Sequence, residues 1–336
     1  MDAKSEVILR HPERIHGQVL LVNPPQDQLC QMLDANVSIW TWNFADYQYL
    51  KQICANSFFD TQIPQHTFEQ IIIFVPKAKE LLAYVLEQCV AALGSGKNIY
   101  LVGEKKAGIE GSAKLLTAFG KTIKIDSARH CQLWQLNIEK TIHAKPLEQW
   151  VKRYTYTLQE QSFNVCALPG VFSQNKLDIG TAQLLPLLNQ VKSGELLDFG
   201  CGAGIIALVL AKLNPQNRIT AADIDAFALQ STTLTFAQNQ VSTQLETIAI
   251  SDIQDIQQSF DAVVSNPPFH QGIKTNYQAS ENLCQYAQQR LKPQGELWIV
   301  ANRFLNYSPL IEQSFGHCQT ILDSHGFKVL YAKNML

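Results

Sequence analysis

One tetrapeptide, Asn266-Pro267-Pro268-Phe269, combines a neutral amide, two rigid backbone positions and a flat apolar ring. The Asn266 side-chain oxygen and the Pro267 carbonyl are two acceptors that could hold both hydrogens of an amine on a planar ring. Such an amine is a poor nucleophile because its lone pair is delocalised into the ring, and the two acceptors would favour a more pyramidal nitrogen. The chemistry indicated is positioning and electrostatics without a titrating base. Phe269 would stack on the ring, which must be unpaired or flipped out.

The simpler interpretation of these four residues, taken alone, is a proline turn with a packed phenylalanine. Their position favours the chemical interpretation. They follow a predicted strand. Alternating predicted strands and helices separate that strand from a glycine-rich loop earlier in the chain. In an open α/β sheet, ligands bind beyond the carboxyl ends of strands near the switch point. We therefore expect the tetrapeptide to face a cofactor there.

The glycine-rich loop reads Asp198-Phe199-Gly200-Cys201-Gly202-Ala203-Gly204 and lies between a predicted strand and a predicted helix. Glycines in that place let a ligand approach the backbone. The spacing of Gly200, Gly202 and Gly204 is GxGxG, whereas a dinucleotide site has GxGxxG. Asp198 also disfavours a pyrophosphate and favours a cationic group. S-adenosyl-L-methionine, which carries an ammonium and a sulfonium, fits this loop better than NAD, and a tight structural turn is the alternative without a ligand.

Three further aspartates follow predicted strands. Asp223 ends the next strand, where a carboxylate can accept hydrogen bonds from both ribose hydroxyls of a nucleoside, as it also does for NAD. Asp225 is the second candidate for that contact. Asp252, after the third strand, could receive an adenine amino group, and a solvated loop aspartate is the alternative interpretation.

The elements that must position these residues are clear in the second half. Apolar strand patterns alternate with helix patterns, which is typical of a parallel, doubly wound α/β sheet. Two more extended runs flank the turn pair His325-Gly326 and predict an antiparallel edge hairpin. The expected strands are 195–199, 218–222, 245–250, 260–265 and 296–301, the helices 205–213, 226–239 and 279–291, and the hairpin runs 317–322 and 327–332.

The first half has the same rhythm, with predicted strands at 18–22, 38–42, 70–75 and 98–102. The segment from Phe68 to Pro76 parallels the segment from Phe260 to Pro268, which indicates an internal duplication. The alternative is that any two parallel sheets share such patterns. Asn23-Pro24-Pro25 follows the first strand, where a glycine loop would belong, and Phe74-Val75-Pro76-Lys77 stands where the tetrapeptide would be. We therefore interpret the first half as a catalytically silent copy.

Composition sets the outer limits. The 336 residues are 46% hydrophobic and 17% charged, with a formal net charge of -2. About 150 residues per domain predicts two domains, and the charge rules out a globally basic nucleic-acid binder. The sequence contains no run of about 18 apolar residues, so it predicts no membrane span. The first residues lack the pattern of a signal peptide. We expect a cytoplasmic protein with no contact with a membrane.

The eight cysteines include no CxxC pair, so we expect reduced, mostly buried thiols and no metal site. Charge is uneven along the chain. Residues 97–153 carry 11 basic and 5 acidic side chains, whereas residues 161–336 carry 10 and 13. The one basic segment therefore lies in the first half of the chain, before the glycine-rich loop, and a solvated charged face is the simpler interpretation of it.

These residues carry a resemblance to a family. The second half resembles the class I S-adenosylmethionine-dependent methyltransferases through the glycine loop and the Asn-Pro-Pro-Phe tetrapeptide. The match is closer still to the 16S ribosomal RNA guanine-N2 methyltransferases of the RsmC type, and it covers nearly the whole chain, strongly from about residue 165 onward. Further matching segments are 168–173, 177–180, 299–302, 101–104 and 124–129.

The resemblance implies two tandem Rossmann-like domains with mostly parallel sheets, a degenerate one at 1–155 and a catalytic one at 156–336. The first would have lost cofactor binding and would serve RNA binding or folding support, with Lys105, Lys106 and Arg129 contacting phosphates. The second would methylate N2 of a guanosine in helix 34 of 16S rRNA on the assembled small ribosomal subunit. The segment from Phe172 to Thr181 would lie against the methionine end of the cofactor. We expect a monomer.

In that segment, the expected cofactor contacts are Phe172, Asp178 and Gly180. Two other interpretations stay open. The same tetrapeptide suits methyltransferases that act on adenine N6 or on a glutamine side-chain amide. A ribosome-assembly protein that binds without turnover is the non-enzymatic alternative, and the intact Asn266 and glycine loop argue against it.

Overall fold

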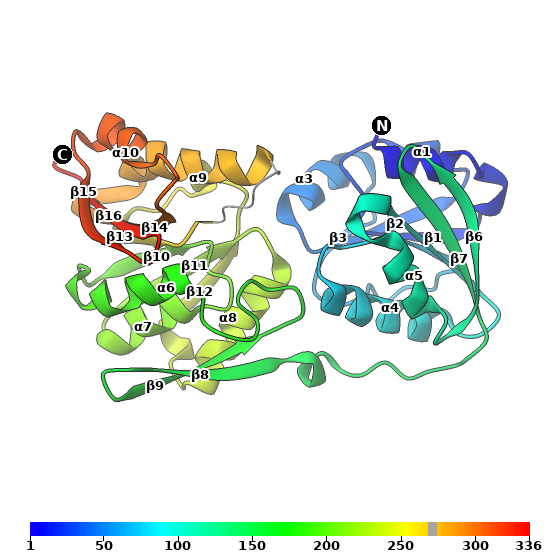
Figure 1. Ribbon diagram of the computed structural model, residues 1–336, viewed down its shortest axis with the longest axis horizontal. Helices are drawn as coiled ribbons and strands as arrows, with labels where there is room; N and C mark the ends of the chain where they lie inside the picture. The colour runs from blue at the N-terminus through cyan, green and yellow to red at the C-terminus, as the bar shows by residue number, and fades with distance from the viewer. Residues whose placement is uncertain (268–273) are drawn as a thin grey trace. The chain divides into compact units, whose positions relative to one another are not determined.

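The computed structural model describes residues 1–267 and 274–336. The chain forms two compact units, Met1–Val151 and Lys152–Leu336 (Figure 1). The boundary lies four residues before the expected one. Before it lie residues 139–146, which contain no helix or strand, and a short 3-10 helix at Leu147–Trp150.

The first unit is a seven-stranded sheet with the order β3-β2-β1-β4-β5-β7-β6. All neighbouring strands are parallel except at β7, which runs antiparallel to β5 and β6. The strands are β1 Gln18–Val22, β2 Asn36–Thr41, β3 Ser57–Phe59, β4 Gln70–Phe74, β5 Asn98–Glu104, β6 Gly120–Ala128 and β7 Cys131–Ile138. The helices are α1 Ala3–Leu9, α2 Leu29–Met32, α3 Phe44–Ile53, α4 Lys79–Leu93 and α5 Ile109–Leu116.

The second unit contains a seven-stranded sheet with the order β12-β11-β10-β13-β14-β16-β15. The strands are β10 Glu195–Phe199, β11 Arg218–Asp223, β12 Leu245–Ala249, β13 Phe260–Ser265, β14 Leu291–Asn302, β15 Gln319–Ser324 and β16 Phe327–Lys333. The helices are α6 Ile179–Leu184, α7 Ile205–Leu213, α8 Ala226–Gln238, α9 Lys274–Tyr286 and α10 Ser308–Phe315. The strands and helices predicted for this half are therefore confirmed, with ends that differ by a few residues.

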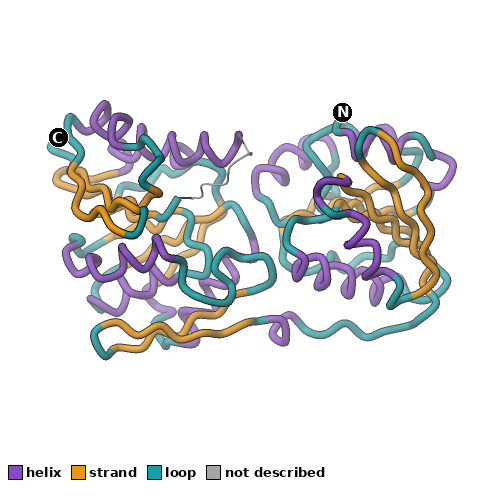
Figure 2. Tube along the Cα trace, in the orientation of Figure 1, coloured by secondary structure: helices purple, strands orange, loops and turns teal. Residues whose placement is uncertain are grey.

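The two seven-stranded sheets have the same order when the strands of each are numbered from the first strand of that sheet. Figure 2 shows that both units combine strands with helices. Gln18 pairs with Asn36 as Glu195 pairs with Arg218. Strand β4 therefore corresponds to β13, as the parallel between the two proline-ended segments predicted. The structure confirms the α/β fold class and a duplicated methyltransferase-like sheet.

Antiparallel hairpins differ from the expectation. The predicted edge hairpin of the second unit is confirmed as β15 and β16. The first unit has a corresponding antiparallel hairpin, β6 and β7, which was not predicted from the sequence. A separate two-stranded sheet, β8 Lys152–Leu158 and β9 Gln161–Ala167, was also not expected. Strand β9 lies against α8, where the amide of Cys166 donates to the Thr235 hydroxyl at 2.9 Å.

Each sheet is covered by helices on both faces, which explains why its central strands are apolar on both sides. In the second unit, α9 and α10 lie on one face and α7 and α8 on the other (Figure 1). Strand β13 shows the result, since Phe260, Ala262, Val263 and Val264 are all completely buried. Such a central strand is a rigid support for whatever follows its carboxyl end.

Candidate active site

The glycine-rich loop leaves the carboxyl end of β10 and leads into α7. Gly200, Gly202 and Gly204 have φ angles of 75°, 55° and 79°, in the left-handed region. At Gly204 a side chain would also be excluded sterically, because its Cβ would lie 2.8 Å from the Thr232 side chain. The Gly200 amide donates to the Ala222 carbonyl on the neighbouring strand at 2.8 Å. The loop is thus held tightly against β11.

Asp198 lies directly beneath this loop and has no exposed surface. Its Oδ2 atom accepts a hydrogen bond from the Ala207 amide at 3.0 Å. Its Oδ1 atom is buried and has no hydrogen-bond partner among the described residues. Burial raises the pKa of Asp198 to about 7, although the Ala207 amide opposes that effect. An orphaned carboxylate oxygen in this place favours a ligand that brings a positive charge or hydrogen-bond donors.

Asp223 is the last residue of β11 and braces the glycine loop. Its Oδ2 accepts from the Gly202 amide at 2.9 Å, and its Oδ1 accepts from the Asp225 amide at 3.0 Å. Asp225 instead caps α8, where its side chain accepts from the Phe227 amide at 2.7 Å. Burial raises the pKa of both carboxyls, that of Asp225 to about 7. Of the two, the Asp223 carboxylate is the one in contact with the glycine loop.

Asp252 has a structural role in the described residues. It caps the short 3-10 helix at Ile253–Asp255 through a capping box. Its Oδ1 accepts from the Gln254 amide at 3.0 Å, and its Oδ2 accepts from the side-chain amide of Asn282 on α9. The expected contact with an adenine amino group stays a prediction.

The glycine-rich loop and the tetrapeptide that begins at Asn266 follow the ends of two adjacent strands. Strand β10 pairs with β13 in parallel, and the register places Phe199 opposite Ser265. The glycine loop begins one residue after Phe199, and Asn266 is one residue after Ser265. Since parallel strands end at the same edge of a sheet, the loop and Asn266 share that edge.

Asn266 is half-buried, and its side-chain amide has a defined direction. The Nδ2 atom donates to Asp178 Oδ2 at 3.0 Å and to Thr181 Oγ1 at 2.8 Å. The Oδ1 atom is buried and has no hydrogen-bond partner among the described residues. A buried, unpaired amide oxygen is costly. Here the oxygen is an acceptor without a described partner at the carboxyl ends of the parallel strands, where ligands bind in open α/β sheets.

The partners of Asn266 come from the start of α6. Asp178 is the N-cap of that helix and accepts from the Thr181 amide at 2.9 Å. Gly180 lies between them, and a Cβ there would be 2.7 Å from the Phe327 ring. Thr181 was given no individual role from the sequence, although an aspartate three residues before a threonine is a local capping pattern. The contact with Asn266 has no signal in the local sequence.

Three other residues were expected at the site. Phe172 has 51% of its surface exposed, so its ring is open to a ligand. Pro267 is buried directly after Asn266. Phe269, the expected stacking residue, lies outside the described residues, as does Pro268.

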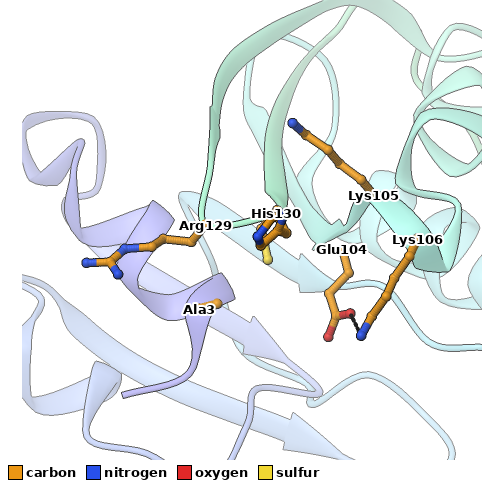
Figure 3. A pocket seen from close by; sticks show the side chains of 7 residues that line it. Ala3, Glu104, Lys105, Lys106, Arg129 and His130 are labelled. Atoms are coloured by element: carbon orange, nitrogen blue, oxygen red, sulfur yellow. Dashed lines mark ion pairs between the residues drawn. The ribbon is translucent and has the colours of Figure 1, made fainter.

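The first unit contains a cavity of about 450 Å³ at the carboxyl end of β5. Its wall includes all three residues expected to contact phosphates, Lys105, Lys106 and Arg129 (Figure 3). Lys106 forms an ion pair with Glu104 at 3.3 Å, and Arg129 forms one with Glu6 at 3.1 Å. The complete lining is Ala3, Glu104, Lys105, Lys106, Arg129, His130 and Cys131.

The first unit lacks the site of the second at each corresponding position. The strand registers match Leu21 to Asp198, Thr41 to Asp223 and Phe74 to Asn266. The backbone turn is kept, since the Asn23 amide donates to the Trp40 carbonyl at 2.7 Å as Gly200 does to Ala222. The first unit therefore keeps the fold and has neither the two carboxylates nor the amide.

Two absences concern the described part of the chain only. No group of three or more histidine, cysteine, aspartate or glutamate side chains there could hold a metal ion. No helix there has the length and apolar character needed to cross a membrane.

Comparison with known proteins covers almost the whole chain. Residues 162–331 match the family model "Methyltransferase small domain", and residues 5–154 match "Methyltransferase small domain N-terminal". The ribosomal RNA small subunit methyltransferase C of Acinetobacter baumannii is 57% identical over 335 residues, covering 99% of both chains. That of Pseudomonas putida is 44% identical over 333 residues, again covering 99% of both.

A solved structure has the same fold. The T. thermophilus 16S rRNA N2 methyltransferase RsmC, in complex with AdoMet and guanosine, superposes with a TM-score of 0.84 at 24% identity. The match covers 99% of this chain and 92% of that one. It therefore includes both units.

Proposed function

Because the chain belongs to the ribosomal RNA small subunit methyltransferase C family, we propose that it methylates the exocyclic N2 amine of a guanosine in 16S rRNA. S-adenosyl-L-methionine is the methyl donor. The proposed target lies in helix 34 on the assembled small subunit. The second unit, in the proposal from residue 156 onward, carries the reaction.

One observation carries the proposal most strongly. The Asn266 Oδ1 atom is a buried acceptor with no partner among the described residues, one residue beyond a central strand and beside the glycine loop. An acceptor without a proton to give suits a substrate that must be held through its N–H groups. An exocyclic amine is such a substrate.

The residues of the second unit fit the cofactor. Asp198 offers an unpaired buried oxygen, and at Gly202 of the glycine loop no atom lies within 4 Å of the place of a side chain. Asp223 is proposed to hold the ribose hydroxyls, and Asp252 the adenine amino group. When bound, S-adenosyl-L-methionine supplies an electrophilic methyl group on a sulfonium. The expected contacts at its methionine end are Phe172, Asp178 and Gly180.

The amine end of the mechanism uses Asn266, Pro267 and Phe269. The Asn266 Oδ1 and the Pro267 carbonyl accept the two N–H groups, which favours a more pyramidal nitrogen whose lone pair is less delocalised into the base. The nitrogen gains positive charge as it takes the methyl group, and both acceptors stabilise that charge. Phe269 is proposed to stack on the base. The methylated nitrogen afterwards releases one proton to solvent water, so no side chain needs to act as a base in the transfer itself.

The first unit, 1–155 in the proposal, supports RNA binding rather than transfer. Its basic cavity brings Lys105, Lys106 and Arg129 together, and no ion pair joins Lys105 to another described residue. Cations with an exposed head bind phosphates without reading the base. The proposed partners are 16S rRNA and the small subunit, and a monomeric, cytoplasmic enzyme fits them.

The experiment is a transfer assay with labelled S-adenosyl-L-methionine. Unmodified small subunits, free 16S rRNA and bulk protein are incubated in parallel, and the labelled products are digested and identified. Label in N2-methylguanosine from small subunits is the expected result. Label in N6-methyladenosine or in glutamine would overturn the proposed acceptor, and label in none of the three would favour a binding protein without turnover.

A further inference from the structure

We infer that Asp178 and Thr181 are positioning residues that hold the Asn266 amide so that its oxygen faces the acceptor amine. The inference deepens the proposed function and rests on it for the identity of the amine. Neither residue needs to touch the base. Both act through Asn266.

The argument begins with the shape of an asparagine side chain. Its oxygen and its NH2 group have nearly the same size, so packing cannot choose between an amide and its flipped form. Hydrogen bonds decide, because one end only accepts and the other only donates. A flipped Asn266 would present N–H to the N–H of the amine, and the amine would not be held.

The described contacts select one form. Both hydrogens of Asn266 Nδ2 have acceptors, Asp178 Oδ2 at 3.0 Å and Thr181 Oγ1 at 2.8 Å. An ionised carboxylate has no hydrogen to donate. A flipped amide would therefore place its oxygen 3.0 Å from a carboxylate oxygen, and both of those hydrogen bonds would be broken or weakened.

Asp178 is itself fixed. A single oxygen, Oδ2, accepts from the Thr181 amide at 2.9 Å, from the Thr181 hydroxyl at 3.4 Å and from Asn266. Because the Thr181 hydroxyl points its proton at Asp178, its lone pairs are left to accept from Asn266. The side chains of Asp178, Thr181 and Asn266 therefore form one hydrogen-bond network in which each donor has a defined acceptor.

The backbone around this network is built for close approach. A Cβ on Gly180 would lie 2.7 Å from the Phe327 ring and 3.1 Å from Asp178 Oδ2. Glycine therefore lets the start of α6 pack between β16 and the end of β13. Thr181 is only 5% exposed, so its hydroxyl is shielded from water that could replace it.

Matched variants separate positioning from packing. Thr181→Val keeps the shape and removes the hydroxyl, whereas Thr181→Ser keeps the hydroxyl and removes a methyl group. Asp178→Asn can keep one oxygen in the place of Oδ2, whereas Asp178→Ser still caps the helix but is too short to reach Asn266. The measurements are the single-turnover methylation rate on small subunits, cofactor affinity by calorimetry, and the melting temperature.

We expect Thr181→Val to lower the single-turnover rate at least about tenfold, with cofactor affinity within about threefold of wild type. Thr181→Ser should stay within a few-fold of the wild-type rate. If Thr181→Val were harmless and Thr181→Ser harmful, Thr181 would be a packing residue. Because Asp178 is also a proposed contact of the cofactor, the double variant Asp178→Ser/Thr181→Val should lose some cofactor affinity and about 100-fold in rate, and Asp178→Asn should lose less of both. A double variant that loses no more rate than cofactor affinity would show that Asp178 acts through the cofactor and not through Asn266.

A second readout does not depend on activity. In protein labelled with 15N at asparagine, the side-chain NH2 signal of Asn266 is the one that disappears in Asn266→Ala. We expect slow hydrogen exchange of that signal in wild type and fast exchange in Asp178→Ser/Thr181→Val. Equal exchange in both would overturn the inference even if the enzyme methylates guanosine. A wild-type enzyme without activity would overturn the proposed function alone.

Discussion

The Ser265 hydroxyl donates a hydrogen bond to the Phe199 carbonyl at 2.6 Å, inside the protein and across two neighbouring strands. Ser265 is completely buried. Asn266, the first residue of the tetrapeptide, follows Ser265, and Gly200, the first glycine of the loop, follows Phe199. The bond therefore helps to fix the distance between Asn266, which is proposed to hold the amine, and the glycine loop, which is proposed to hold the cofactor.

Ser265→Ala tests this link. The variant leaves a buried carbonyl with one partner fewer, which costs about 1–3 kcal/mol in the free energy of unfolding. We expect that decrease in the transition of the second unit, measured by urea unfolding. The exposed Ser162→Ala on β9 is the control. Equal stability of the two variants would contradict the assigned role of the Ser265 hydroxyl.

Gly204→Ala tests the tight turn of the loop. Both φ strain and a contact with Thr232 oppose a side chain there. Gly108→Ala is a matched control, because Gly108 also precedes a helix in the left-handed conformation, with φ 86° and ψ 29°, and its Cβ would meet nothing within 4 Å. Strain alone costs about 1 kcal/mol. We expect Gly204→Ala to be less stable than the control and to weaken cofactor binding at least about tenfold by calorimetry.

The acidity of Asp198 predicts a pH effect. Burial raises its pKa from the ordinary value near 3.8 to about 7, so between those two values the folded state holds a proton that the unfolded state has released. The free energy of unfolding therefore falls as pH rises through that interval, by up to about 1.4 kcal/mol per pH unit for each such group. Asp198→Asn should make the fall shallower.

Denaturant unfolding at several pH values between about 4 and 7 measures that slope. Asp225 has a similar pKa and its contribution remains in the variant. A cationic ligand beside Asp198 should also displace its proton, so cofactor binding near pH 6 is expected to release protons in wild type and fewer in Asp198→Asn. An identical pH slope in the two proteins would show that Asp198 is ionised in the unliganded fold.

The basic cavity predicts a salt effect. Lys105→Ala and Arg129→Ala should each weaken binding to 16S rRNA and lower the slope of log affinity against log salt by about 0.7–0.9 for each phosphate that the variant no longer neutralises. Lys51→Ala on α3 removes the same charge from the first unit outside the cavity and is the control. If all three variants bind alike, the cavity is a solvated charged face.

The sequence was sufficient for elements whose signals are local. Strands such as β10 and β13 are apolar runs that end at glycine or proline, and the hairpin of β15 and β16 has a glycine in its turn, Gly326. The two hairpins that were missed turn on Arg129-His130 and Gln159-Glu160, pairs of residues with positive φ and no glycine. Their turns carry no sequence signal.

The candidate site likewise contains some residues that have a local sequence signal and some contacts that have none. The glycine loop, Asp198 and Asn266 could be named because each lies in a short motif. The hydrogen bonds from Asn266 join it to residues 88 and 85 positions earlier in the chain. That contact depends on how α6 packs against the end of β13, which no local pattern encodes.

The most direct test of the account is Asn266→Ala. Wild type, this variant and the exposed control Asn306→Ala are compared by single-turnover transfer to unmodified small subunits, with cofactor affinity measured on the same preparations. We expect Asn266→Ala to be slower by about 100- to 1000-fold while its cofactor affinity stays within about threefold of wild type. A variant that methylates N2 of guanosine at the wild-type rate would contradict the account.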